Sequence, residues 1–543
     1  MIRVIERYPI LSIIFSVLVM FSFGVHYLDV TIMEARNFIT AREMITDGNW
    51  LLTTMNGEPR YQKPPLPTWL AALSGLLFGI KNVIALRLPG ILMVAVLGVS
   101  SYLFSLKLQL KKAHALINAL ITITSFYVVA IVIEAPWDIF THGFMFLGIY
   151  HLYQLFKKSK GYWKHTLLAG LFIGLSIMCK GPISIYVLLV PFLIAYGISY
   201  KYTMFKAKAF SVFSVLIIAL ILGGWWYLYV RLVDPETFLA IAAKETGNWS
   251  SYNVRPFYYY WSFFVQSGLW TIPAVVALVY PYMKTRVKHL KAYKLSFWWV
   301  IMTVILLSVI PEKKSRYLMP VLIPLAINTG FYIDYLVRNF KSINKLEKIP
   351  VYFNFIIIGL IAVGFAFLWP FFGMLLLVVN LKLYAFAALV LLLCGIGIFW
   401  QLKKKNLKKV FYFTVVFYIS AVALIIPLNN FESKTEGQES LSNLKSQALA
   451  EGYEVYALET VSPEFIWYFG DKIPSISTLD SIKNYTGSRF GLLSKTLSAQ
   501  ERSLLSKKFT LDSIGVYDLN QRAPEASGHR SRLRNNFYLL TKK

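Results

Sequence analysis

The sequence predicts a polytopic α-helical membrane protein that ends in a small α/β domain. Of its 543 residues, 57% are hydrophobic and only 15% are charged, and its mean hydropathy of +0.56 is too high for a soluble protein of this length. Uncharged runs of about 20 residues, the length that a helix needs to cross the hydrocarbon core, recur between Pro9 and Pro427. The chain after residue 428 is polar. We therefore expect a transmembrane domain (1–428) and a soluble domain (429–543).

The first apolar run extends from Pro9 to Tyr27 and follows Arg3 and Arg7. Basic residues before an apolar stretch are also typical of a signal peptide, but no small-residue cleavage site follows this one. The run is long enough to span a bilayer, so we expect a retained first helix. The same length criterion predicts about 13 spans in all. The expected spans are 9–27, 82–105, 114–132, 138–156, 164–179, 182–200, 209–230, 261–282, 292–310, 317–337, 350–371, 376–400 and 408–427.

The connections between these spans indicate the orientation of the chain, because Lys and Arg stay on the cytoplasmic side. Cations are concentrated in segments 107–112, 157–164, 201–208, 284–294, 337–348 and 403–409. All of these segments are cytoplasmic if the N-terminus is inside and the number of spans is odd. The net charge of +28 then reflects orientation, and no nucleic-acid partner is expected. The outward segments are 28–81, 133–137, 180–181, 231–260, 311–316 and everything after 428.

Outward segments carry cations that this orientation does not explain. The stretch "YQKPPLP" presents Lys63 beside prolines that stiffen the backbone, and "MCKGP" presents Lys180 at a break between spans. Arg255 precedes an aromatic run, and "PEKKSRY" contains Lys313 and Arg316. Lys provides a point charge and Arg a bidentate fork for phosphate. These residue types at the membrane edge predict an anion pocket.

A simpler interpretation exists for each of these cations. A few cations are tolerated on the outer side, where they contact lipid headgroups, and Lys180 would reach the interface by snorkelling. The aromatic residues from Tyr258 to Trp261 are expected to form part of an interfacial belt. Arg255 is less easily explained in this way.

Carboxylates are scarce in the outward segments, so the few that occur are candidates for catalysis. In the stretch 28–44, which contains Asp29 and Glu34, the apolar positions fit a helix lying in the membrane interface. Arg42 and Glu43 are expected on the solvated face of that helix.

Asp138 lies near the outer end of an expected span. A carboxylate is costly there and marks a functional site, unless it only complements the positive end of the helix dipole. We expect Glu134, on the neighbouring loop, to be solvated and His142, one turn below Asp138, to pack in the core.

No motif of a soluble enzyme is present. The sequence has no Walker loop, no GxGxxG after a strand, no Cys or His pair at metal spacing and no nucleophile elbow. An outward-facing membrane site has no ready ATP or nucleotide sugar. A substrate built on a lipid phosphate fits both the location and the cations.

The soluble domain has the pattern of a small α/β module. "YEVYAL" (453–458) and "NNFYLLT" (535–541) are typical of strands. "SPEFIWYFG" (462–470) is typical of a helix with a capping Ser at its start.

The segment "DVTIMEARNFITAREMITDGNWLLTTMNGEPRYQKPPLPTWL" resembles the first outer loop of bacterial membrane glycosyltransferases of the aminoarabinose transferase and protein mannosyltransferase superfamily. "WDIF", "MCKGP", "NVRPFYYY" and "KKSRYLMP" resemble later motifs of that superfamily, in the same order. The resemblance implies the GT-C fold and a polyprenyl-phosphate-linked sugar donor. It also implies the bacterial inner membrane, with a cytoplasmic N-terminus and a periplasmic C-terminal domain.

The resemblance also implies roles for individual residues. Lys63 would contact the lipid phosphate, helped by Lys180 and Arg255, and Tyr317 would line the same cavity. Glu34 and Asp138 would be the acidic residues near the sugar and the acceptor. The further candidates are Arg316, Lys313 and Arg36 for the phosphate and Asp29 for catalysis.

This chain departs from the superfamily pattern at three positions. Met33 stands where the first residue of an Asp-Glu pair is usual, so the expected acid is absent unless Asp29 substitutes. Gln62 replaces an acidic residue, and the third outer loop has no His near Asn253. In the aminoarabinose branch the last two positions hold a metal. The replacements argue against a divalent metal, and no other cofactor is indicated.

The expected function is the inverting transfer of a sugar from a polyprenyl-phosphate donor to a lipid or glycan acceptor in the membrane, a lipid A-like glycolipid above all, by a monomer. The alternatives are a protein O-mannosyltransferase-like enzyme and a non-catalytic polyprenyl-phosphate binder or transporter. Met33 motivates the non-catalytic alternative. A transporter should have helices that are broken or charged in the middle of the membrane, and it should have repeat symmetry. The centres of the spans expected here are apolar and unbroken, and no repeat is visible.

Overall fold

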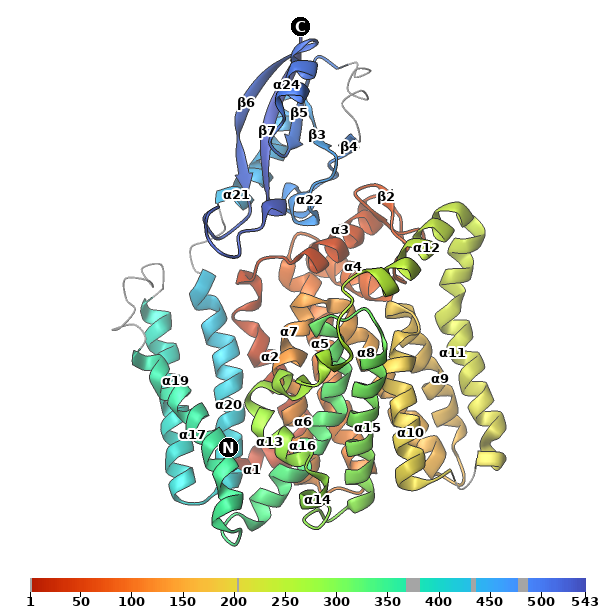
Figure 1. Cartoon of the computed structure of the whole chain (residues 1–543), viewed down its shortest axis with the longest axis vertical. Coiled ribbons are helices and arrows are strands. Elements are labelled where there is room, and N and C mark those ends of the chain that lie inside the picture. The colour runs from red at the N-terminus through yellow and green to blue at the C-terminus, as the bar shows by residue number, and fades with distance from the viewer. Residues whose placement is uncertain (1, 203–204, 368–380, 431–435, 477–486) are drawn as a thin grey trace. The chain divides into compact units, whose positions relative to one another are not determined.

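The computed structural model describes residues 2–202, 205–367, 381–430, 436–476 and 487–543, which form two compact units (Figure 1). Unit 1 comprises Met1–Leu28, Tyr61–Leu70 and Asn82–Phe431. Unit 2 comprises Asp29–Arg60, Ala71–Lys81 and Glu432–Lys543. Part of the expected first outer loop therefore folds with the C-terminal segment.

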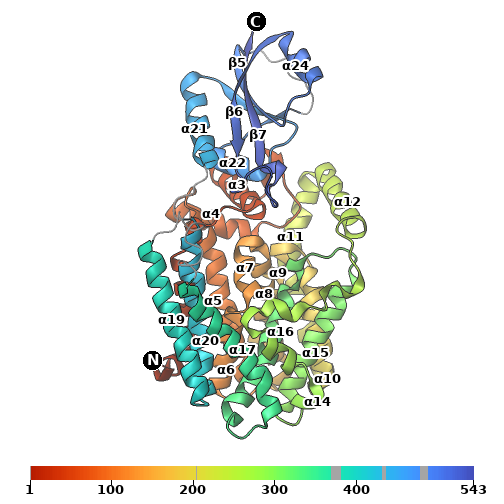
Figure 2. The same cartoon turned by 60° about the vertical axis from the view of Figure 1, so that its left-hand side comes forward.

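Unit 1 is a bundle of helices with a continuous apolar core. Its helices are α1 (Ile2–Arg7), α2 (Pro9–Ser22), α5 (Val83–Lys107), α6 (Lys112–Ile123), α7 (Phe126–Glu134), α8 (Pro136–Lys157), α9 (Trp163–Lys180), α10 (Val190–Tyr200), α11 (Phe205–Val233), α12 (Pro235–Ser251), α13 (Thr271–Ala277), α14 (Tyr280–Met283), α15 (Leu290–Val309), α16 (Met319–Asn339), α17 (Lys345–Gly364), α19 (Leu381–Lys403) and α20 (Leu407–Ile425). Helices α17, α19 and α20 lie side by side in both Figure 1 and Figure 2. Helix α4 (Leu66–Phe78) is divided between the two units.

Eight helices in the described part of the chain are long and apolar enough to cross a membrane, or nine if α6 and α7, which meet at 42°, form one span. The chain is thus a multi-pass membrane protein, but the expected number of about 13 spans is not confirmed. The expected span 261–282 is divided into the 3-10 helix η4 (Phe263–Trp270), α13 and α14, because Gly268 has a φ of +66° and prolines follow. The boundary between the expected spans 350–371 and 376–400 falls at 368–380, outside the described residues.

Two further expected spans are continuous helices that carry polar groups. Helix α8 contains an Asp and two His residues, and α9 contains a His and two Lys residues. Neither helix is therefore apolar enough to be counted among the eight candidate spans. The expected span 182–200 begins with the π-helical turn η2 (Ile185–Leu189) and continues as α10. These helices were located correctly by the sequence. The counts differ because α8 and α9 carry polar residues, η2 and α10 are short, and the span expected at 261–282 is broken.

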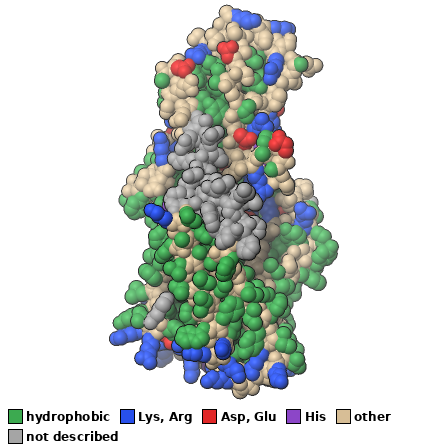
Figure 3. Space-filling view, turned by 90° about the vertical axis from the view of Figure 1, so that its left-hand side faces the viewer, with side chains coloured by type: hydrophobic (Ala, Val, Ile, Leu, Met, Phe, Trp, Pro, Cys, Tyr) green, Lys and Arg blue, Asp and Glu red, His purple; other side chains and the backbone are tan. Residues whose placement is uncertain are grey.

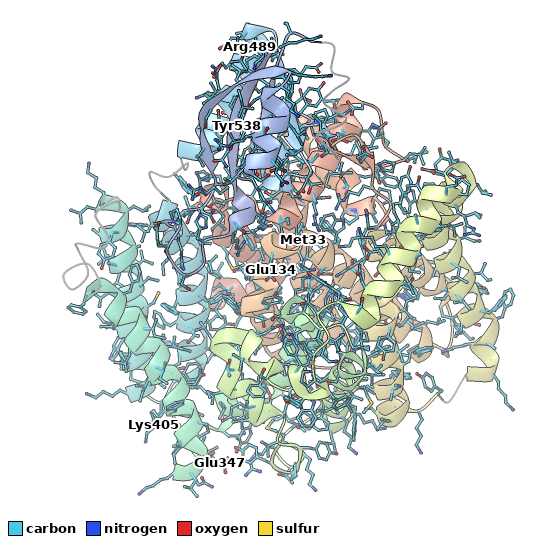
Figure 4. The ribbon with its side chains drawn as sticks, turned by 45° about the horizontal axis from the view of Figure 1, so that its top comes forward. Met33, Glu134, Glu347, Lys405, Arg489 and Tyr538 are labelled. Carbon is cyan, nitrogen blue, oxygen red and sulfur yellow. The ribbon has the colours of Figure 1, made fainter. Side chains whose placement is uncertain are left out.

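The surface of unit 1 has the distribution of side chains that a membrane requires. Hydrophobic side chains cover the helices on the face shown in Figure 3, and Lys and Arg gather along the lower edge. Glu347 and Lys405 lie at this end (Figure 4). There the Glu347 carboxylate pairs with Arg286 at 3.1 Å and accepts hydrogen bonds from the hydroxyls of Tyr282 and Tyr335. On this face the cations of unit 1 are thus concentrated at one end.

Glycines of α9 allow this helix to pack closely against α11. A Cβ added to Gly170 would lie 2.7 Å from the Cβ of Ile218, and one added to Gly174 would lie 2.7 Å from that of Leu222. Small residues let helix backbones approach closely in membranes. This packing fixes α9, whose last residue is Lys180.

Unit 2 contains a five-stranded mixed sheet and the helix of the first loop. Its elements are α3 (Ile32–Thr46), β1 (Thr54–Met55), β2 (Glu58–Pro59), α21 (Glu436–Glu451), β3 (Glu454–Leu458), α22 (Pro463–Phe469), β4 (Ser475–Ile476), β5 (Arg489–Ser494), α24 (Ala499–Ser506), β6 (Phe509–Asp518) and β7 (Arg534–Lys542). The sheet order is β4-β3-β5-β7-β6, with β3 parallel to β4 and β5, and β7 antiparallel to β5 and β6. The expected strands at 453–458 and 535–541 correspond to β3 and β7.

The expected helix at 462–470 corresponds to α22, but its capping was predicted wrongly. Ser462 occupies the N-cap position without a hydrogen bond from its side chain to the helix, and its buried hydroxyl has no partner among the described residues. Helix α22 packs against α3, where the rings of Phe38 and Trp467 lie 5.3 Å apart and Arg42 donates a hydrogen bond to the carbonyl of Ile466 at 3.3 Å.

The expectation that Arg42 and Glu43 are solvated is wrong. Arg42 is 8% exposed and Glu43 is 1% exposed, because α22 covers the first and the β1–β2 hairpin covers the second. The Glu43 carboxylate accepts hydrogen bonds from the Thr54 hydroxyl and the Asn56 amide, each at 2.6 Å. This charged face of α3 is therefore an internal face of unit 2.

Candidate functional site

A break between α7 and α8 places a buried carboxylate at the start of a helix. Helix α7 ends at Glu134, Ala135 leaves the helical conformation with φ −154° and ψ 77°, and Pro136 begins α8. Proline suits the first position of a helix because its missing N–H would have no partner there. Asp138 follows in the first turn and is 1% exposed. The positive end of the helix dipole favours a carboxylate at this position.

Lys180 pairs with this carboxylate from the end of α9. The Lys180 ammonium donates to Oδ1 of Asp138, and the side chains are 16% and 2% exposed. Gly181 ends the helix with a φ of +74°, and a Cβ there would lie 2.8 Å from the hydroxyl oxygen of Tyr227. Glycine is required at this turn because other residues rarely adopt a positive φ. The "KGP" sequence thus serves to present Lys180.

Lys63 and Tyr317 lie around the ion pair. The Lys63 ammonium is 4.7 Å from the ring centroid of Trp137, the neighbour of Asp138, and interacts electrostatically with the Asp138 carboxylate. The Lys180 ammonium is 5.1 Å from the ring centroid of Tyr317. Oδ2 of Asp138 is buried and has no hydrogen-bond partner within the described residues. Lys63, Asp138, Lys180 and Tyr317 thus form one cluster, which we call the Asp138 cluster.

The segment that carries Lys63 is anchored two residues earlier. The Tyr61 hydroxyl donates a hydrogen bond of 3.1 Å to Asp234, which also accepts from the Thr237 amide as the N-cap of α12. Burial, together with the hydrogen bond to Asp234, raises the pKa of Tyr61 to about 12. The hydroxyl therefore stays protonated at neutral pH and holds the segment in place.

Lys313 is held by backbone carbonyls of its own loop and of the loop that carries Arg255. It is 3% exposed, and its ammonium donates to the carbonyls of Arg255 at 3.1 Å and Ile310 at 2.5 Å. Burial lowers the pKa of Lys313. The Arg255 amide also donates to the Pro311 carbonyl at 3.2 Å, so the two loops are joined by their backbones. The Arg255 side chain is exposed and has no contact with the cluster among the described residues.

Arg316 lies beside the cluster, and its neighbours correct one expectation. Its guanidinium carbon is 5.9 Å from the Tyr317 ring centroid, and its buried Nε has no hydrogen-bond partner in the described part of the chain. The aromatic run before it is not one uniform belt. Tyr258 and Trp261 are 65% and 57% exposed, but Tyr260 is fully buried and its hydroxyl accepts from the Lys314 amide at 3.0 Å.

The remaining acidic candidates belong to unit 2. Glu34 is fully buried and forms a capping box with Thr31, each side chain accepting from the other residue's amide at 3.1 and 3.2 Å. The sequence carried a signal for this arrangement, since Thr-x-x-Glu before an apolar run is typical of a capping box. Asp29 accepts a hydrogen bond of 2.6 Å from Gln521. Arg36 also lies on α3, with its guanidinium 3.9 Å from the Met33 sulfur.

The residues at the positions associated with a metal do not fit one. Gln62 and Asn253 supply amides, and within the described ranges no group of three or more His, Cys, Asp or Glu side chains is arranged to hold an ion. His142 is buried, as expected.

The chain thus combines a helical membrane bundle, a small α/β unit and, within the bundle, a buried carboxylate with two ammonium groups beside it. Residues 62–227 match the family model of dolichyl-phosphate-mannose-protein mannosyltransferase. An uncharacterized protein of Aquifex aeolicus (strain VF5) is 26% identical over 432 residues, which are 76% of this chain and 78% of that protein.

Named relatives carry the comparison further. Undecaprenyl phosphate-alpha-4-amino-4-deoxy-L-arabinose arabinosyl transferases of Shewanella sediminis (strain HAW-EB3) and Proteus mirabilis (strain HI4320) are 24% and 25% identical over 54% and 61% of this chain. The chain spans only 54% and 59% of the length of these two relatives. The crystal structure of ArnT from Cupriavidus metallidurans bound to undecaprenyl phosphate superposes with a TM-score of 0.67 at 15% identity, covering 98% of this chain and 97% of that one. The resemblance that the motifs indicated is confirmed, and the fold is that of ArnT-like GT-C glycosyltransferases.

Proposed function

We propose that the protein transfers a sugar from a polyprenyl-phosphate donor to a cell-envelope glycolipid at the outer face of the bacterial inner membrane. The observation that carries the proposal is the Asp138 cluster, in which two ammonium groups flank one buried carboxylate. The motifs of the first outer loop support the same donor class, as does the similarity in fold to ArnT from Cupriavidus metallidurans, whose crystal structure is bound to undecaprenyl phosphate.

Lys63 and Lys180 are assigned to the phosphate of the donor. As the bond between the anomeric carbon and the phosphate oxygen breaks, its electron pair moves to the phosphate. Preorganised ammonium groups stabilise the charge that grows there. Arg316, whose buried Nε is unpaired among the described residues, is placed to assist through its guanidinium.

Asp138 is assigned to the sugar. Its carboxylate is fixed by Lys180, and it faces the positive charge that develops on the sugar ring in an oxocarbenium-like transition state. Attack by the acceptor from the opposite side of the ring inverts the anomeric carbon. Glu34 and Asp29 remain predictions for carboxylates near the sugar and the acceptor, and Arg255 and Arg36 remain predictions for the phosphate.

The phosphate assignment is tested with Lys63→Ala in the purified full-length protein. We expect turnover from undecaprenyl-phosphate-linked pentoses and hexoses to extracted lipid A to fall about 100-fold. Binding of undecaprenyl phosphate, followed by native mass spectrometry, should weaken in parallel. Lys405→Ala, at the end of unit 1 that carries Glu347 (Figure 4), is the matched control and should retain both activities.

The outcomes separate the candidate functions. Unchanged turnover of Lys63→Ala would exclude the phosphate role of this residue. If the wild-type protein binds undecaprenyl phosphate but transfers no sugar to any acceptor, the non-catalytic binder is correct. Mass spectrometry of lipid A, other surface glycans and envelope proteins from a deletion strain identifies the acceptor, and a missing sugar on a protein would support the protein O-mannosyltransferase-like alternative.

A further inference from the structure

Glu134 is an exposed carboxylate at the break beside Asp138. It is the last residue of α7 and has no ion pair among the described residues. The negative end of the helix dipole disfavours a carboxylate there, in contrast to the position of Asp138 at the start of α8. The helix dipole therefore gives no reason for a carboxylate at this position.

The Glu134 carboxylate is nonetheless held in place. The Tyr127 hydroxyl, two turns earlier on α7, donates a short hydrogen bond to its Oε2. Tyr127 also interacts electrostatically with Arg316 and Asp138. Figure 4 shows Glu134 away from the end of unit 1 that carries Glu347 and Lys405. Tyr127 thus links Glu134 to the edge of the Asp138 cluster.

The two carboxylates at this break differ in what they are able to do. Asp138 is buried and its charge is compensated by Lys180. Glu134 is exposed, and its hydrogen-bond partner among the described residues is the neutral hydroxyl of Tyr127. A base must be accessible to the group whose proton it takes. Of the two, Glu134 meets this requirement.

We propose that Glu134 is the general base of the reaction and that the acceptor group is a hydroxyl. The acceptor oxygen forms a bond with the anomeric carbon, the bond from that carbon to the phosphate oxygen breaks with its electron pair, and the hydroxyl proton passes to the Glu134 carboxylate. A phosphate acceptor, already ionised, would need no such base. Tyr127 is a positioning residue that orients the carboxylate. This inference rests on the proposed function.

Glu134→Gln tests the base, since an amide keeps the shape and can accept the hydrogen bond from Tyr127. We expect turnover to fall by about 100-fold or more, the usual contribution of a general base, while the KM for the donor stays the same. The melting temperature should be unchanged or higher, because a charge at the unfavourable end of α7 is removed. Glu245→Gln, at another exposed Glu of unit 1, is the control and should be fully active.

Tyr127→Phe tests the positioning role through the pH dependence of turnover. Loss of the hydrogen bond to the charged carboxylate makes that carboxylate easier to protonate, so the acid limb of the profile should move to higher pH. A merely structural role would lower turnover equally at every pH.

The possible results are distinguishable from those for the proposed function. Wild-type turnover in Glu134→Gln, or a product in which tandem mass spectrometry places the new sugar on a phosphate, would overturn the assignment of the base while leaving the transferase in place. Absence of transfer by the wild-type protein would instead remove the function on which this inference rests.

Discussion

At the scale of single residues, the ion pair between Lys180 and Asp138 places two opposite charges in the buried part of the site. Both partners are largely buried, and each comes from the end of a different helix. Removing water from two charges is expensive, so such a pair adds little net stability over an apolar pair. Removing one partner leaves an isolated buried charge, which is far worse. Each partner therefore allows the other to remain charged in an apolar environment.

This view predicts the behaviour of single and double variants. Lys180→Met should destabilise unit 1 by about 3 kcal/mol or more, because Asp138 is left buried and unpaired. Adding Asp138→Asn should recover most of the melting temperature but no transfer activity. Thermal unfolding of the purified protein measures both variants. Lys408→Met is the control, since its pair with Glu6 is 42% and 26% exposed and contributes about 1 kcal/mol or less.

A contrary result would be a double variant that melts no higher than Lys180→Met. Asp138 would then tolerate isolation, and the pair would have no special place in the stability of the site.

At the scale of elements, unit 2 is held together by contacts between α3 and the segment around α22. Beyond the buried Arg42, Lys472 pairs with Asp47 at 2.8 Å at the end of α3. The hydrogen bond from Lys472 lowers the pKa of Asp47 below its ordinary 3.8, and the same bond raises the pKa of Lys472 above 10.5. The stabilisation is therefore present between these limits, lost as pH falls through the folded value of Asp47, and lost as pH rises through that of Lys472.

The pH dependence is tested by hydrogen exchange of the amides from 466 to 473 in the full-length protein. At pH 7, Asp47→Asn should exchange faster than wild type, by about five-fold at most, because the pair is partly exposed and contributes about 1 kcal/mol or less. Comparison at equal pH removes the intrinsic effect of pH on exchange. The ratio should approach one below pH 3.8, the ordinary value for Asp. A ratio that stays constant down to pH 3 would contradict the assignment.

At the scale of the whole molecule, the expected orientation leads to a labelling experiment. Ser342 lies in a segment expected in the cytoplasm, Ser527 lies in the C-terminal segment, and both are exposed. The native cysteines are buried, which keeps the background low. In spheroplasts, an impermeant maleimide should label Ser527→Cys, whereas Ser342→Cys should react only after permeabilisation. The opposite pattern would reverse the proposed orientation.

Sequence reasoning located the helices well because apolar length and charge are local properties. The predictions that were wrong or incomplete concern contacts between residues that lie far apart in the sequence. The contact between Asp138 and Lys180 joins two different helices, and that between Arg42 and Ile466 joins the first loop to the C-terminal segment; no periodicity encodes either. Lys313 looked like a ligand because its charge is visible in the sequence, while the carbonyls that surround it are not. Local patterns therefore identified candidate residues but could not tell which side chains meet.

The composition of unit 2 bears on how shortened forms of this protein should be made. Residues 29–60 and 432–543 share one folded unit, although about 370 residues separate them along the chain. A truncation at residue 428 would expose the faces of Phe38 and Arg42 that α22 covers. Helix α3 would then be left without its packing partner, and the shortened protein would be prone to aggregate. Expression of a minimal catalytic fragment should therefore keep both segments or remove both together.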